Sequence, residues 1–136
     1  MIGLANSAEV DALWPQLSAR FQEAIDRCGD DISAADLWQM CRSGNAFLMV
    51  AMEDDVPAMG AVLQFQKWER GTVLRCLVLA GEDMGRWFAE LPAAIRKIAR
   101  EGGATRFVFD GRDGWERIIM PLKIPKKLRT TYEVEI

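Results

Sequence analysis

The chain has no histidine among its 136 residues and only one tyrosine. Without an imidazole, histidine general bases and histidine-containing zinc sites are excluded. The three cysteines, Cys28, Cys41 and Cys76, are odd in number and form no CxxC pair. We therefore expect buried, unpaired thiols in a reducing cytoplasm, and no metal site.

Long apolar runs are missing as well. No segment approaches the ~20 apolar residues that a membrane-spanning helix needs. The first residues, MIGLANSAEVD, lack the basic and apolar regions of a secretion signal. The composition, 50% apolar and 27% charged, is typical of a globular protein. We expect one domain over residues 1–136 that is cytoplasmic and makes no membrane contact.

Charge is unevenly distributed along the chain. Residues 1–68 carry 4 Lys/Arg against 10 Asp/Glu, a net charge of −6, and residues 69–136 carry 13 against 10, a net charge of +3. Such polarity could steer a partner, and two solvated faces of one domain would give the same count. The basic segment 122–129 has no interleaved aromatic residues, so we do not expect nucleic acid binding.

Two helices are predicted near the amino terminus. Apolar positions recur at helical spacing over residues 8–28, with Ser7 as the expected N-cap. Ser33 and Asp36 have the spacing of a capping box and predict the start of a second helix. Gly44 is expected to end that helix.

Six further segments predict one long helix and five strands. The runs 46–52, 58–68 and 73–80 are strand-like and are joined by short turns, which favour antiparallel neighbours. Residues 105–110 are a strand candidate. Residues 130–136 alternate between apolar and polar positions, which predicts a half-buried strand.

Two prolines fall inside helical patterns. The apolar stripe over residues 83–101 predicts a long helix, and Pro92 lies within it. Proline removes one backbone hydrogen bond, so we expect a kink or a split at Pro92. Pro15 has a similar place in the first helix, where it could mark a restart.

The element order resembles that of the GNAT fold of acyl-CoA-dependent N-acyltransferases. The similarity covers residues 45–136, with the two helices in the expected place and residues 1–5 as the candidate first strand. The resemblance implies an α/β (α+β) fold with a mostly antiparallel central sheet flanked by helices. The stretches LVLAGEDMGRWF, FDGRDGWER and TTYEVEI resemble, more narrowly, small GNAT-like proteins of tailed phages and prophages.

A glycine-containing junction corresponds to the phosphate loop of that family. In the family this loop has the form Arg/Gln-x-x-Gly-x-Gly/Ala, and its amides hold the pyrophosphate of coenzyme A. Here Glu82 and Asp83 lie at the expected helix start and would repel a pyrophosphate, although Asp83 could serve simply as an N-cap. The resemblance implies these candidate cofactor-binding residues: Gly81, Met84, Gly85 and Arg86.

The second family signature is a tyrosine that protonates the departing thiolate. Ile119 falls at that position, and the one tyrosine, Tyr132, is expected on the core side of the last strand. The catalytic residues are therefore unknown. Glu53, Glu69 and Glu82 are conceivable bases. The acidic helix start predicts weak or no coenzyme A binding, and the missing tyrosine predicts low turnover.

A charged segment with two glycines, residues 110–117, is the main candidate partner surface. Arginine and tryptophan dominate binding hot spots, which makes Trp68, Arg112, Trp115 and Arg117 candidate partner contacts. Alternatively, the glycines form turns, Trp115 anchors the core and the charges form a solvated cluster.

Two functions follow from these observations. The first is a catalytically degenerate phage-type protein that binds a virion or host protein and uses no cofactor. The alternative is an active N-acyltransferase that moves an acetyl group from acetyl-CoA to an unknown amine. The oligomeric state stays open.

Overall fold

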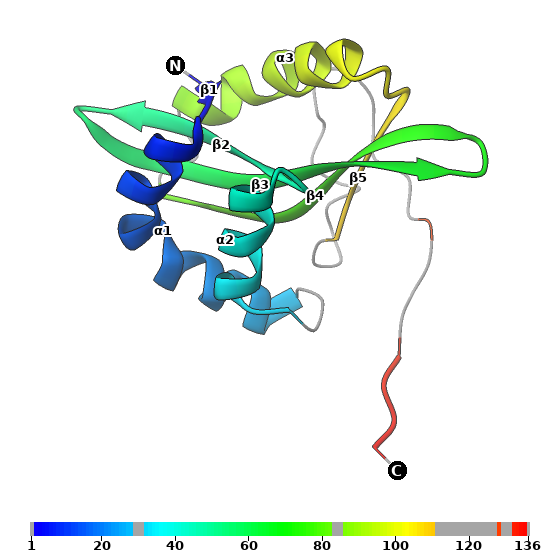
Figure 1. Cartoon of the computed structure of the whole chain (residues 1–136), viewed down its shortest axis with the longest axis horizontal. Coiled ribbons are helices and arrows are strands. Elements are labelled where there is room, and N and C mark those ends of the chain that lie inside the picture. Colours follow the sequence, from blue (N-terminus) through cyan, green and yellow to red (C-terminus); the bar gives the residue numbers. More distant parts are fainter. Residues whose placement is uncertain (1, 29–31, 83–85, 111–127, 129–131, 136) are drawn as a thin grey trace.

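The computed structural model describes residues 2–28, 32–82, 86–110, 128 and 132–135. Within this part of the chain, five strands form one sheet in the order β1-β2-β3-β4-β5, with helices on both faces (Figure 1). The elements are β1 (Ile2–Leu4), α1 (Ser7–Cys28), α2 (Ala34–Ser43), β2 (Phe47–Glu53), β3 (Val56–Trp68), β4 (Gly71–Gly81), α3 (Arg86–Glu101) and β5 (Arg106–Phe109). The predicted fold class is confirmed, and so is the predicted element order over residues 2–109, including a short first strand.

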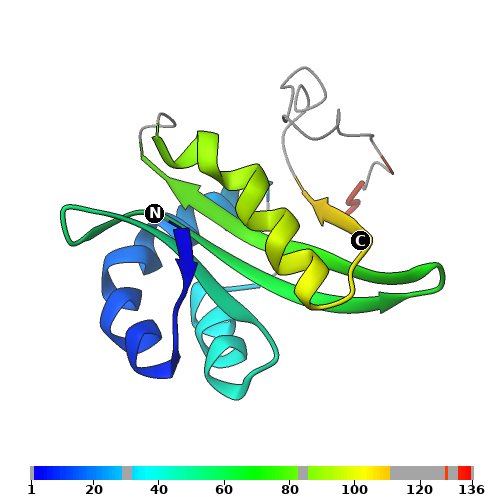
Figure 2. The same cartoon turned by 90° about the horizontal axis from the view of Figure 1, so that it is seen from above.

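The sheet is antiparallel from β1 to β4, and β5 alone runs parallel to its neighbour β4. The chain reaches β5 by crossing over through α3, which a parallel neighbour requires. Helices α1 and α2 cover one face, and α3 covers the other (Figures 1 and 2). The continuous apolar run of β2 is thereby explained, because both of its faces are buried.

Each face of the sheet has its own core. The α1–α2 face buries Leu48, Val50, Val62 and Val78 with the apolar stripes of both helices. The α3 face buries Met49, Ala61, Leu63 and Leu74, together with Trp87, Leu91, Ile95 and Ile98 of the helix. The strict alternation of side chains along a strand distributes these residues between the two cores.

Helix α1 packs closely on the sheet at Gly60 of β3. A Cβ atom built on Gly60 would lie 2.9 Å from Cζ of Phe21 and 3.0 Å from Cδ1 of Leu17. A larger residue would push α1 off the strand, so the glycine permits the close approach that buries both side chains completely.

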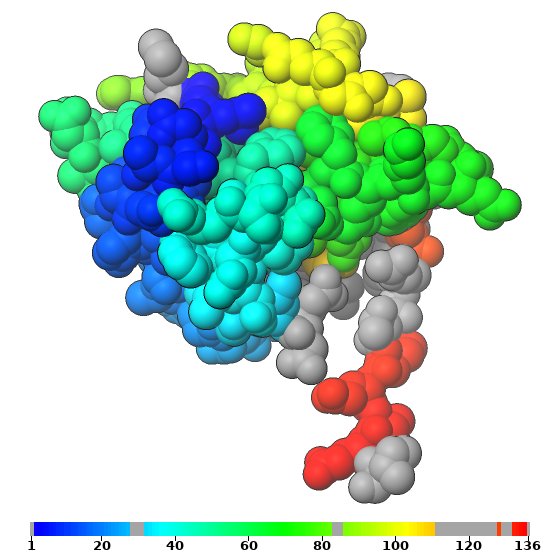
Figure 3. Space-filling model, in the orientation of Figure 1, coloured from blue at the N-terminus to red at the C-terminus, as the bar shows by residue number. Residues whose placement is uncertain are grey.

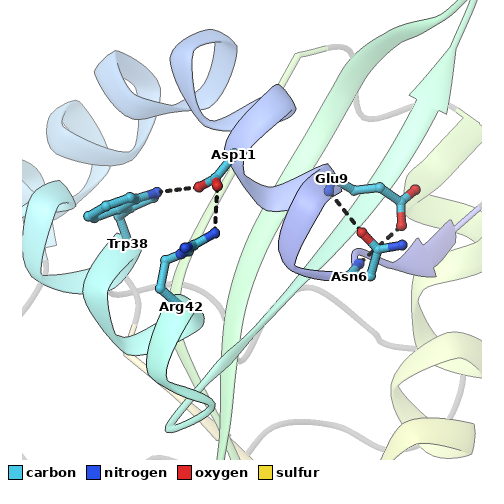
Figure 4. Close-up of polar contacts among 5 residues, drawn as sticks. All are labelled: Asn6, Glu9, Asp11, Trp38 and Arg42. Atoms are coloured by element: carbon cyan, nitrogen blue, oxygen red, sulfur yellow. Dashed lines mark hydrogen bonds and ion pairs between the residues drawn. The ribbon is translucent and has the colours of Figure 1, made fainter.

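The N-cap of α1 differs from the sequence prediction. Asn6, rather than Ser7, caps the helix: its Oδ1 accepts from the backbone N–H of Glu9 at 2.9 Å. In return, the Asn6 backbone N–H donates to Glu9 Oε1 at 3.0 Å (Figure 4). A glutamate lies three residues after Asn6, whereas Val10 lies three residues after Ser7, so only Asn6 can form the reciprocal capping box.

Helix α2 has the ends that its sequence predicts. Ser33 caps it and Asp36 completes the capping box, with hydrogen bonds of 2.9 and 3.1 Å. The backbone N–H of Ser33 lowers the pKa of Asp36 below its usual value by bonding to its carboxylate. Gly44 ends the helix in the left-handed conformation, with φ of 82°.

A polar contact joins α1 to α2. Asp11 accepts hydrogen bonds from Trp38 Nε1 at 3.1 Å and from Arg42 Nη1 at 2.5 Å (Figure 4). The Arg42 guanidinium also lies 5.9 Å from the centre of the Trp38 ring. Asp11 thus holds two side chains of the neighbouring helix, which fixes how the two helices pack.

Neither proline breaks its helix. Helix α1 continues through Pro15, and α3 continues through Pro92, so the predicted restart and split are wrong. Apolar residues on both sides of each proline pack into the same core, for example Trp87 and Ile95 around Pro92. This shared burial outweighs the loss of one backbone hydrogen bond.

The predicted last strand is also wrong within the described residues. Residues 132–135 form no strand, and their chain extends away from the sheet (Figures 1 and 3). Tyr132 is 86% exposed and Val134 is 79% exposed, so neither faces the core. Alternation specifies which face of a strand would be buried, but a strand also needs a neighbouring edge with which to pair.

Candidate functional site at the β4–α3 junction

Strand β4 contains a bulge in its second half. Val62 of β3 is opposite Val78, and the next residue of β3, Leu63, is opposite Cys76. Leu77 is therefore an extra residue in β4. A bulge of this kind bends the strand, changes which face each later side chain occupies, and is over-represented beside active sites.

The pairing between β4 and β5 ends at the bulge. It runs from Val73 opposite Arg106 to Cys76 opposite Phe109, and β5 ends there. Figure 2 shows β5 beside only the first part of β4. We call this place the fork. Beyond it, no strand in the described part of the chain pairs with the β5 side of residues 77–81, which we call the free edge of β4.

The free edge leads directly to the start of α3, and close packing holds the two together. A Cβ atom on Gly81 would lie 2.7 Å from Cζ2 of Trp87 and 3.2 Å from the backbone oxygen of Ala58. Trp87 is 4% exposed, and its Nε1 donates to the backbone oxygen of Glu82 at 2.8 Å. Gly81 is thus a glycine because the Trp87 ring lies against it.

Glu82 at the junction is paired with a cation from another element, which the sequence does not indicate. The carboxylate of Glu82 pairs with Arg20 of α1, with 3.0 Å between Nη2 and Oε1. Arg20 Nη1 also donates to the backbone oxygen of Pro57 at 3.3 Å, which holds the guanidinium in place. The first turn of α3 as described contains Arg86 and no acidic residue. Arg20 and Arg86 therefore offset the negative charge of Glu82.

Backbone groups at this site suit an extended ligand with an anionic end. A free strand edge offers N–H and C=O groups to a ligand that carries amides of its own. The start of a helix carries partial positive charge and unpaired N–H groups, which favour phosphate. The free edge of β4 and the start of α3 follow each other in the chain, so one ligand could contact both.

The two described thiols are not nucleophiles. Cys76 and Cys41 are free and buried, as predicted. Burial raises the pKa of Cys76 to about 12, and its Sγ donates to the backbone oxygen of Val78 at 3.4 Å. Burial raises the pKa of Cys41 to about 11. Both thiols therefore stay protonated near neutral pH, whereas the nucleophile is the thiolate.

A row of polar side chains runs along β3 and ends beside Arg106 of β5. Gln66 Nε2 donates to Gln64 Oε1 at 2.8 Å, and Trp68 Nε1 donates to Gln66 Oε1 at 2.9 Å. The Arg106 guanidinium lies 5.4 Å from the centre of the Trp68 ring. Trp68 is half-buried and contacts Gln66 and Arg106 of its own chain. Less of its surface is therefore accessible to a partner than the sequence suggests.

The structure describes some of the candidate residues and not others. Gly81 and Arg86 lie at the junction, where the phosphate-loop comparison placed them. Glu69 lies in the β3–β4 turn, at the opposite end of β4 from Gly81. The following candidates lie outside the described residues: Met84, Gly85, Arg112, Trp115 and Arg117.

The described part of the chain offers neither a metal site nor a membrane-spanning helix. It contains no group of three or more His, Cys, Asp or Glu side chains that could hold a metal ion. It contains no helix long and apolar enough to cross a membrane. A shallow hollow of about 420 Å³ lies along α3 and is lined by α3 residues alone, so it does not include the free edge of β4.

Solved structures with the same architecture are acetyltransferases. An aminoglycoside acetyltransferase from an uncultured soil metagenomic sample superposes with a TM-score of 0.70 at 16% identity, over 100% of this chain and 97% of its own. The ribosomal-protein-alanine N-acetyltransferase from Brucella melitensis biovar Abortus 2308 gives 0.69 at 12% identity, over 100% and 98%. An acetyltransferase from Trypanosoma brucei gives 0.66 at 14% identity, over 99% of each chain.

The chain has the GNAT fold. The superpositions cover nearly the full length of both partners, and the mixed sheet with helices on both faces is the same. No protein-family model and no curated protein matches the sequence. The TM-scores of 0.69 and 0.70 establish the GNAT fold, whereas identities of 12–16% leave substrates and activity to be argued from the site.

The bulge and the fork could not be located from the sequence. Leu77 lies within a run of apolar residues, where an extra residue changes no visible pattern. The pairing of Arg20 with Glu82 joins residues far apart in the chain, and only the packing of α1 against β3 and β4 brings them together. The one local signal was the position of Gly81 at the end of an apolar strand.

Proposed function

We propose that this GNAT-fold protein binds acetyl-CoA at the β4–α3 junction and transfers its acetyl group to an amine. The observation that carries the proposal is the fork, where β4 loses its partner β5 after Cys76 and continues as a free edge towards α3, which begins at Arg86. The free edge of β4 suits the amides of the pantetheine arm, and the start of α3 suits the pyrophosphate.

The electrostatic argument against binding is weaker than it is from the sequence alone. That argument counted Glu82 and Asp83 as two negative charges beside the phosphates, and Asp83 lies outside the described residues. The pairing of Glu82 with Arg20 removes much of the repulsion from Glu82, and Arg86 adds a positive charge in the first turn of α3. Two oppositely charged groups 3.0 Å apart present little net charge to a third group several ångströms away.

The reaction requires only the amine and the thioester. The amine nitrogen attacks the thioester carbonyl carbon, a C–N bond forms and the C–S bond breaks. The amine proton passes to solvent or to a base, and the thiolate takes a proton from solvent. Positioning of the two reactants can supply a large part of the rate enhancement, so the absence of a tyrosine at position 119 lowers turnover without preventing transfer.

A second candidate function is a binding scaffold that has lost catalysis. The position of the one tyrosine favours it, because Tyr132 is 86% exposed and lies in no strand. In this alternative the protein serves a virion or host partner through the segment around Arg112 and Trp115. A phage or prophage origin stays a prediction.

Chemical-shift mapping separates the two candidates. Acetyl-CoA titrated into ¹⁵N-labelled protein should shift amide signals of residues 77–81 and of the first turn of α3. A parallel assay follows the free thiol of coenzyme A with a panel of primary amines. Shifts with thiol release support the transferase, shifts without thiol release support the scaffold, and no shifts at the junction exclude our proposal.

A further inference from the structure

An ion pair between a buried arginine and a partly exposed aspartate lies at the fork. Arg75 of β4 is 6% exposed, and it is the one buried charged residue in the part of the chain that the structure describes. Its Nη2 lies 2.6 Å from Oδ2 of Asp110, the residue that directly follows β5. The side chain of Asp110 is 42% exposed, so its carboxylate can accept further hydrogen bonds.

Stability alone does not account for this pair. Taking an arginine out of water costs several kcal/mol, and replacement of a buried ion pair by apolar residues is often neutral or stabilising. The pair does fix the position of a carboxylate. Arg75 is held in the sheet by its neighbours Gln64 on β3 and Val108 on β5, so its guanidinium holds Asp110 from a rigid element.

Asp110 follows β5 at the level where the free edge of β4 begins. Cys76 and Phe109 are the last paired residues of the two strands, and Asp110 and Leu77 are the first after them. A reactive group carried along the free edge of β4 towards the fork would therefore approach the carboxylate of Asp110.

We infer that Asp110 binds the acceptor amine by accepting a hydrogen bond from its N–H, and that Arg75 is the residue that positions Asp110. This inference rests on the proposed acetyl transfer. It assigns the acceptor as a primary or secondary amine. A neutral tertiary amine has no N–H to donate, and neither does a quaternary ammonium ion.

The pairing with Arg75 suits Asp110 to this task. An unpaired carboxylate would favour the ammonium form, which has no lone pair and cannot attack the thioester. A carboxylate already paired with a guanidinium attracts a second cation less strongly and still accepts a hydrogen bond. Asp110 therefore holds and orients the amine, and we assign it no proton transfer.

The test compares Asp110→Asn with the matched control Glu69→Gln, which removes a carboxylate from the far end of β4. Spermidine and tryptamine serve as probe amines, and their binding is followed by saturation-transfer NMR without acetyl-CoA. We expect Asp110→Asn to weaken the binding of both amines about 10- to 100-fold, the loss expected for one charge-assisted hydrogen bond. Glu69→Gln should bind them as the wild type does.

Turnover gives a second measurement. Asp110→Asn should raise KM for the amine by the same factor, change kcat less than about threefold, and leave acetyl-CoA binding intact. Arg75→Lys should retain most of the turnover because it keeps a cation beside Asp110, whereas Arg75→Met should lose turnover because an unpaired carboxylate favours the ammonium form of the amine. Retention in Arg75→Lys shows that the loss is not a folding defect.

Three outcomes have distinct meanings. Unchanged amine binding in Asp110→Asn overturns the inference, as does a wild-type protein that binds neither probe. Amine binding that depends on Asp110 in a protein that does not bind acetyl-CoA supports the amine site and contradicts the proposed transferase.

Discussion

Arg20 and Glu82 form an ion pair that connects α1 to the β4–α3 junction, with 3.0 Å between Nη2 and Oε1. The pair offsets a negative charge beside the proposed phosphate site. Its contribution to folding should be small, because the side chains are 31% and 72% exposed and exposed pairs contribute about 0–1 kcal/mol. Its main effect should therefore be on binding.

Removing Arg20 should weaken acetyl-CoA binding. In Arg20→Ala the charge of Glu82 is no longer offset, and we expect the dissociation constant to rise several-fold at low salt and less at high salt. Glu82→Gln should have the opposite effect. Calorimetric titrations of both variants at two ionic strengths measure this, and identical affinities in both variants would rule out a role for the pair.

Adding a methyl group to Gly81 should destabilise the protein. The new Cβ would lie 2.7 Å from the Trp87 ring, so either the ring or the start of α3 must move. We expect Gly81→Ala to lose about 1–3 kcal/mol of unfolding free energy. Gly3→Ala is the matched control, because nothing lies within 4 Å of a Cβ there. Equal denaturation midpoints for the two variants would contradict the packing.

Substitution of Asn6 should destabilise α1 more than substitution of Ser7. Asn6→Ala removes the side chain that accepts from Glu9, and loss of such a cap costs about 1 kcal/mol. Ser7→Ala lies one residue away and should change stability little. Urea denaturation of both variants measures the difference, and a larger loss in Ser7→Ala would restore the cap that the sequence suggested.

The buried thiols make stability depend on pH in the alkaline range. The unfolded chain releases a thiol proton near the ordinary pKa of 9.0, whereas folded Cys76 holds its proton up to about 12. The contribution to stability is therefore full below pH 9.0 and declines as the pH rises from there towards 12. Thermal unfolding in a reducing buffer should show a shallower decline above pH 9 for Cys76→Ala than for the wild type.

The sequence predicts well those features that depend on neighbouring residues. The capping box of Ser33 and Asp36 and the left-handed end at Gly44 follow from local chemistry, and both are present. The element order also follows from periodicity and turn spacing. Neither a restart at Pro15 nor a split at Pro92 occurs, because local backbone cost competes with burial, and burial depends on tertiary packing that a helical stripe does not specify.

The candidate site depends on contacts between distant residues, so the sequence located only part of it. The sequence indicates Gly81 as a junction residue. The structure explains why this residue is a glycine by the close approach of the Trp87 ring, without a phosphate contact. The sequence does not indicate that Arg75 pairs with Asp110, because the two residues meet only when β5 lies beside β4. The alternation in residues 130–136 predicts a half-buried strand, and residues 132–135 form none, because alternation carries no information about a pairing partner.

Direct titration of the protein with acetyl-CoA tests the central claim most directly. Calorimetry at low salt and neutral pH should give a dissociation constant in the micromolar range, and Arg86→Glu should weaken it at least about tenfold by placing a negative charge at the start of α3. A wild-type protein that gives no binding heat, or that binds only in the millimolar range, would contradict the account.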